Sequence, residues 1–142
     1  MGNRILLWGI LLLAALAFAV GVWKRMWPDV EMGRRLAENN CGVCHDLNDA
    51  HRNRKGPFLW AVVDRPAGAI ADFTYSAAFL ASVKAKPFVW DEANLERFIT
   101  DPSSFIPMTR MAQRDAGHPL AFEGIDSAAN RRDVIAYLKT LK

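Results

Sequence analysis

The sequence has very little cysteine, only two residues in 142, and the two lie three positions apart. A pair this close cannot crosslink distant parts of a fold, which argues against a disulfide-stabilised scaffold. The chain also lacks a basic excess beyond its first segment, because without Arg4, Lys24 and Arg25 it has 15 basic and 15 acidic side chains. Binding a phosphate backbone needs a clear positive excess, so we expect no nucleic-acid partner. Repeats and low-complexity stretches are absent as well, and the length suits one small domain.

Residues 5–23 form a run of 19 side chains without charge or strong polarity. As a helix this run would be roughly 28 Å long, close to the roughly 30 Å hydrocarbon core of a bilayer. Trp8, Trp23 and Trp27 lie near its ends, where indole rings favour the membrane interface. A cleaved signal peptide is the alternative, because Ala17-Phe18-Ala19 resembles a cleavage site, but the apolar run continues past it. We expect residues 1–28 to be a retained transmembrane anchor and linker, contacting the bilayer through residues 5–23, and residues 29–142 to be one exported domain.

The rest of the hydrophobic pattern is helical and does not alternate as strands do. It predicts helices over residues 29–40, 75–84, 91–100 and 127–141, with Asp29 and Asp91 as N-terminal caps. The fold class expected is therefore all-α. Long loops with glycine and proline separate these helices, at residues 46–65 and 103–124. So much loop in a small domain indicates that something other than the chain fills part of the core.

The sequence Cys41-Gly42-Val43-Cys44-His45 has the spacing of a c-type haem attachment site. Two thiols on one turn can bond the two vinyl groups of one porphyrin, and the histidine that follows can reach the iron. A redox-active dithiol does not need that histidine, and the βαβ unit in which it usually occurs is absent. A structural zinc site would need a matching second pair of ligands, which His51 and His118 do not provide by their spacing. We expect one covalent haem c, bound through Cys41 and Cys44, with His45 as an iron ligand.

A second axial ligand is predicted in residues 105–111, Phe-Ile-Pro-Met-Thr-Arg-Met, which follow the third expected helix of the domain. A methionine is ordinarily a core filler. Met108 and Met111 lie instead on a loop held by proline, away from any apolar helical face. Both are candidate ligands, and the local sequence does not choose between them.

From about residue 30 to the end, the chain resembles a class I cytochrome c of the branch that includes mitochondrial cytochrome c. The motifs that carry the resemblance are Val30-Glu31-Met32-Gly33, the attachment site, Gly56-Pro57, Phe73-Thr74-Tyr75, Phe-Ile-Pro-x-Thr-Arg-Met, and the last helix with its Tyr137. The resemblance implies a cytochrome c fold, three to five helices around one covalently attached haem. It also implies that Gly33 allows the first helix of the domain to cross the last one closely.

The resemblance further assigns roles around the haem. The carbonyl of Pro57 would accept a hydrogen bond from His45, and Met111 would be the second iron ligand. The remaining cofactor-binding residues would contact the propionates or the buried haem edge; they are Arg65, Tyr75, Trp90 and Thr109.

Four features depart from the family pattern. Phe98 stands where a tyrosine commonly lies near the methionine sulfur, and Phe79 stands where asparagine is frequent, so the pocket is expected to be drier. Met108 replaces the usual glycine, which keeps it open as a less favoured ligand. Residues 112–121 form an insertion of roughly nine residues, expected beside the exposed haem edge where partners dock.

These features predict an electron-transfer protein and not an enzyme, because a haem iron with two protein ligands has no open coordination site for a substrate. We expect it at the bacterial inner membrane with its haem domain in the periplasm. It would carry single electrons from a quinol-oxidising cytochrome bc complex to a terminal oxidase or photosynthetic reaction centre. The short linker keeps a fixed subunit of one redox complex as the main alternative. A haem enzyme or sensor with a labile distal ligand, and bis-histidine ligation through His51 or His118, are weaker alternatives.

Overall fold

The computed structural model describes residues 2–112 and 121–142, and within the first helix it describes the side chains of residues 8–23. The described residues form six α-helices and one short 3-10 helix, and their only β-bridge joins Pro66 to Val89. The all-α prediction is therefore confirmed. In chain order the elements are α1 (Gly2–Met26), α2 (Val30–Asn40), α3 (Ala77–Ala85), α4 (Glu92–Thr100), α5 (Pro102–Phe105), η1 (Arg110–Ala112) and α6 (Ala128–Leu138).

The helices of the domain begin where short polar side chains cap them. Asp29 accepts a hydrogen bond from the backbone N–H of Met32, and Asp91 accepts one from Asn94, as predicted. Ser76 and Ser127 cap α3 and α6 in the same way. The helix predicted over residues 75–84 therefore begins two residues later, and the helix predicted over residues 127–141 ends at Leu138, where a tighter turn takes over.

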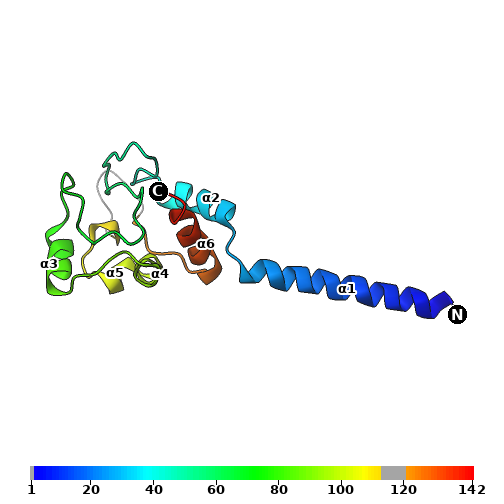
Figure 1. Cartoon of the computed structure of the whole chain (residues 1–142). Helices are drawn as coiled ribbons and strands as arrows, with labels where there is room; N and C mark the ends of the chain where they lie inside the picture. The colour runs from blue at the N-terminus through cyan, green and yellow to red at the C-terminus, as the bar shows by residue number, and fades with distance from the viewer. Residues whose placement is uncertain (1, 113–120) are drawn as a thin grey trace.

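The core forms where α2 crosses α6, and α4 packs beside α6 (Figure 1). A Cβ atom on Gly33 would fall onto the backbone carbonyl of Asp133, so the absence of a side chain sets how closely the two helices approach. This confirms the close crossing expected for Gly33. The side chains buried around this crossing are Ala37, Leu95, Ile99, Val134, Ile135 and Leu138.

A second cluster of aromatic rings extends the core away from α6 and fixes the loops. Trp90 lies at its centre, 4.9 Å from Phe88 and 4.9 Å from Phe98 between ring centroids. The backbone of Trp90 donates to Arg65 and accepts from Asp64, at 2.9 and 3.0 Å. The long loop before α3 is thereby tied to the segment that leads into α4.

Helix α1 extends away from the other helices (Figure 1). Its described side chains are all exposed. Ten of them are large and hydrophobic, from Trp8 to Trp23, and each of these is between 44% and 75% exposed. Within the part of the chain that the structure describes, no helix is long and apolar enough to cross a membrane. The chain enters the domain at Asp29, whose backbone N–H donates to Asp133 Oδ1 at 2.9 Å.

Candidate functional site

The two cysteines lie on the turn that ends α2. The backbone N–H groups of Cys44 and His45 both donate to the carbonyl of Cys41, at 3.0 and 2.9 Å, so the five-residue motif forms one tight turn. Both thiols are free, Cys41 being buried and Cys44 partly buried. Burial raises the pKa of Cys41 to about 11. The turn thus presents two thiols and one imidazole within a single loop of backbone, as the spacing predicted.

His45 is oriented by the loop that returns beneath it. Its Nδ1 lies 2.6 Å from the carbonyl oxygen of Pro57. A carbonyl can only accept, so Nδ1 carries the hydrogen and Nε2 keeps its lone pair for a metal. Burial lowers the pKa of His45, which favours this neutral form. A Cβ atom on Gly56 would fall onto the His45 ring, so glycine is required there for the loop to pass.

Residues 46–56 are held by a buried acid that sequence reasoning missed. Asp46 is 4% exposed and accepts hydrogen bonds from Arg52 Nε at 3.1 Å and from the Asn48 side chain at 2.9 Å. The bond from Arg52 lowers the pKa of Asp46 to about 2, so the carboxylate is charged at neutral pH. Its position directly after the attachment motif was the available signal. Asp46 is a positioning residue, since it shapes the loop that carries Pro57.

Three residues assigned to the haem propionates lie along the aromatic side of the site. Arg65 is half-buried and donates to the carbonyls of Phe58 and Trp60, at 2.8 and 3.2 Å. The Tyr75 hydroxyl accepts from the backbone N–H of Ile70 at 3.3 Å. Tyr75 stacks on Phe79 and Phe79 stacks on Trp90, with centroids 4.9 and 6.4 Å apart. The structure therefore places Tyr75 and Trp90 along one aromatic stack, with Arg65 bonded to the backbone of Trp90.

The loop from α5 to η1 separates the two candidate methionines. Met111 is partly buried and packs against the hydrophobic core, whereas the Met108 side chain is 75% exposed. Thr109 between them is buried, at 5% exposure. The carbonyl of Met111 accepts a hydrogen bond from Phe122 N–H at 3.2 Å, so the predicted insertion, residues 112–121, leaves and rejoins the described chain beside Met111. Residues 113–120 of that insertion, His118 included, lie outside the described residues. His51 is exposed and stacks on Phe58.

Met108 adopts φ 61°, in the left-handed region that favours glycine. The loop therefore keeps the backbone conformation that suits the glycine of the family pattern, although a methionine occupies the position. We expect Met108→Gly to raise the free energy of unfolding by up to about 1 kcal/mol. Glycine relieves the strain of the left-handed conformation, and this gain is larger than the loss from the greater conformational entropy of the unfolded chain.

Guanidinium denaturation followed by haem absorbance measures this gain. Met32→Gly is the control, because Met32 is also on the surface, at 39% exposure, but lies in α2, where glycine is expected to cost up to about 1 kcal/mol. A Met108→Gly variant that loses stability as Met32→Gly does would contradict the strain.

The site fits a covalently bound haem. It offers two free thiols on one turn, an imidazole with Nε2 available, a partly buried methionine in η1, and a stack of aromatic rings. The sequence pattern of the family "Cytochrome c" matches residues 30–142. The chain belongs to the cytochrome c family. As a class I monohaem cytochrome c it carries covalent haem c, and it is an electron carrier and not an enzyme.

Known proteins support the same assignment over the same part of the chain. Cytochrome c of Euglena viridis is 35% identical over 114 residues, which cover 80% of this chain and 98% of that protein. A cytochrome c homolog of Rickettsia felis is 38% identical over 112 residues, 79% of this chain but only 56% of that longer protein. The solved structure of cytochrome cH from Methylobacterium extorquens, 34% identical, superposes with a TM-score of 0.63 and covers 79% of this chain and 98% of its own.

Proposed function

We propose that this cytochrome c binds its haem iron through His45 and Met111 and transfers single electrons without binding a substrate at the iron. The observation that carries the proposal is the pair of ligand positions. Pro57 leaves Nε2 of His45 available, and Met111, in contrast to the exposed Met108, packs into the domain. In this assignment Cys41 and Cys44 attach the haem, Arg65, Tyr75 and Trp90 lie towards its propionates, and Thr109 lies beside its buried edge. Bound haem supplies the one-electron chemistry of its iron.

The residues of the pocket favour the reduced state. A thioether such as that of Met111 is a neutral, soft ligand, and the rings of Phe79 and Phe98 are both buried. An additional positive charge is poorly solvated in such surroundings, so the oxidised state is disfavoured and the midpoint potential rises. A redox titration of the purified holoprotein is expected to give a positive midpoint potential. A value well below zero would rule out methionine ligation.

Membrane attachment is the second part of the proposal. The described side chains of α1 expose a continuous apolar surface that no other helix covers, including Leu11, Leu12, Leu13 and Phe18. A bilayer would remove this surface from water. We propose that residues 1–28 anchor the protein in the bacterial inner membrane, with residues 29–142 in the periplasm. There it would pass electrons from a quinol-oxidising cytochrome bc complex to a terminal oxidase or photosynthetic reaction centre.

The entry to the domain gives weight to a second candidate, a fixed subunit of one redox complex. Only Trp27, Pro28 and Asp29 separate α1 from α2, and Asp29 is bonded to Asp133 on α6. The domain therefore has little freedom to swing on its anchor. Purification from native membranes under mild detergent separates the candidates: a shuttle is recovered largely alone, and a fixed subunit is recovered with a constant set of partners.

The anchor is tested by placing charge on α1. The double variant Leu12→Arg, Leu16→Arg is expected to reduce retention in membranes after alkaline carbonate washing, because each arginine near the centre of a spanning helix costs about 3 kcal/mol. Leu80→Arg on α3 is the matched control, since Leu80 is also exposed but lies in the haem domain. Wild-type protein that is washed off the membrane, as a peripheral protein is, would contradict the anchor.

A further inference from the structure

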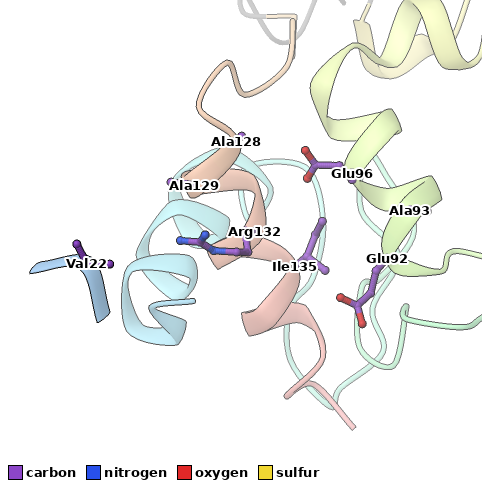
Figure 2. A pocket seen from close by; sticks show the side chains of 8 residues that line it. All are labelled: Val22, Glu92, Ala93, Glu96, Ala128, Ala129, Arg132 and Ile135. Atoms are coloured by element: carbon purple, nitrogen blue, oxygen red, sulfur yellow. The ribbon is translucent and has the colours of Figure 1, made fainter. Parts of the chain in front are cut away.

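A groove of about 760 Å³ lies on the side of the domain nearest α1. Figure 2 shows that its walls come from three helices, with Val22 from α1, Glu92, Ala93 and Glu96 from α4, and the rest from α6. The residues from α6 are Ala128, Ala129, Arg132 and Ile135. Its wall is mainly apolar and contains no residue of the proposed haem site.

The acidic groups of this groove are already paired. Glu96 accepts from Arg131 Nε at 2.6 Å, and Glu92 accepts from Lys139 Nζ at 2.5 Å. Each carboxylate is therefore matched by a cation from α6 or the turn after it. Neither pair involves Arg132, so the charge of Arg132 is not cancelled by the acids that line the groove with it.

Arg132 has a buried donor without an acceptor among the described residues. Its Nε is inaccessible and makes no hydrogen bond, while 42% of the side chain is exposed. The nearest acid is Asp133, whose Oδ1 lies 3.8 Å away and already accepts from the backbone of Asp29 at 2.9 Å. The enclosed Nε cannot be reached from the groove, but the exposed part of the Arg132 side chain leaves its positive charge open to an anionic oxygen that binds there.

The position of Val22 places the groove relative to a membrane. Val22 is one residue from the end of the apolar run at residues 5–23, about 1.5 Å along a helix axis. Trp23 and Trp27, whose rings lie 6.0 Å apart, follow at once, and indoles favour the headgroup region. If α1 spans the bilayer, residues of α4 and α6 that share a groove with Val22 lie at the depth of the lipid headgroups.

We propose that this groove binds the headgroup phosphate of an anionic membrane lipid, with Arg132 as the cation and the apolar wall beside Val22 against the start of an acyl chain. The inference rests on the proposed membrane anchor. A lipid held there would fix the rotation of the haem domain about α1, because it would join α6 to the membrane at a second point.

Native mass spectrometry of the detergent-purified, full-length holoprotein measures lipid retention directly, with phosphatidylglycerol and phosphatidylcholine as probes. Wild-type protein is expected to retain phosphatidylglycerol in preference to phosphatidylcholine. Arg132→Gln is expected to bind phosphatidylglycerol about tenfold more weakly, the loss of one charge-assisted hydrogen bond. Ala129→Phe, which fills the groove but keeps the charge, is expected to lower retention as well. Lys84→Gln is the charge-matched control, because α3 lies at the opposite end of the domain from α1 (Figure 1).

Equal retention of phosphatidylglycerol by wild type and Arg132→Gln would overturn the site, and so would equal retention of the two lipids by wild type. The second comparison needs no variant, so it holds even if Arg132→Gln folds poorly. Flotation of the wild type with pure phosphatidylcholine vesicles tests the anchor separately. Protein that floats but shows no preference for phosphatidylglycerol would remove this inference alone, whereas protein that does not float would remove the anchor.

Discussion

Replacing Met111 with alanine is expected to lower the midpoint potential by about 100 mV or more and to abolish the methionine–iron absorption band of the oxidised protein. A fall of 100 mV corresponds to a loss of about 2.3 kcal/mol of preference for the reduced state, at 59 mV per tenfold change in a one-electron equilibrium. The physical cause is the loss of a neutral sulfur donor, with solvent entering next to the iron in its place. Met111 packs against the core, so the position it leaves lies inside the domain.

Met108→Ala is the matched control for this experiment. Met108 is three residues away on the same loop, but its side chain is 75% exposed. We expect its alanine variant to keep both the absorption band and the potential. The opposite result, with the band lost in Met108→Ala and kept in Met111→Ala, would transfer the ligand role to Met108. Loss of the band in neither variant would point to ligation from elsewhere, as in a bis-histidine site.

The parts of the fold that depend on neighbouring residues could be predicted from the sequence. The caps Asp29 and Asp91 accept hydrogen bonds from N–H groups three residues later, so the sequence spacing contains all the information needed. The attachment turn is equally local, because Cys41, Cys44 and His45 are joined by bonds within five residues. The contacts of Gly33 with α6 and of His45 with Pro57 are distant in sequence, and only the family resemblance indicated them.

The parts that were missed either have the sequence of an ordinary turn or depend on tertiary contacts. Helix α5 is only four residues long, and it begins because Asp101 caps it and accepts from Ser104 N–H at 3.0 Å. Residues of this kind occur in many turns that do not become helices. Asp46 has the composition of a surface loop residue, and only its fold context buries it. The groove beside α1 was not predictable at all, because it joins Val22 to residues about 70 to 113 positions later in the chain.

The crossing of α2 and α6 leads to the second large prediction, on stability. Gly33→Ala is expected to lower the free energy of unfolding by about 3 kcal/mol, at the upper end of typical overpacking costs. Its new Cβ would meet the backbone carbonyl of Asp133, and backbone atoms in two packed helices cannot move aside as a flexible side chain can. The higher helix propensity of alanine would raise the free energy of unfolding by only about 1 kcal/mol, so the clash makes the variant less stable than the wild type.

Denaturation of the holoprotein followed by haem absorbance tests this effect, and Gly21→Ala is the control. Gly21 is also helical, but a Cβ atom there would meet nothing within 4 Å, so the haem domain of that variant should unfold as the wild type does. Separation of α2 from α6 would also disturb the contact of Asp29 with Asp133, which lies at the same crossing. A Gly33→Ala variant as stable as the wild type would show that the helices cross at a greater distance.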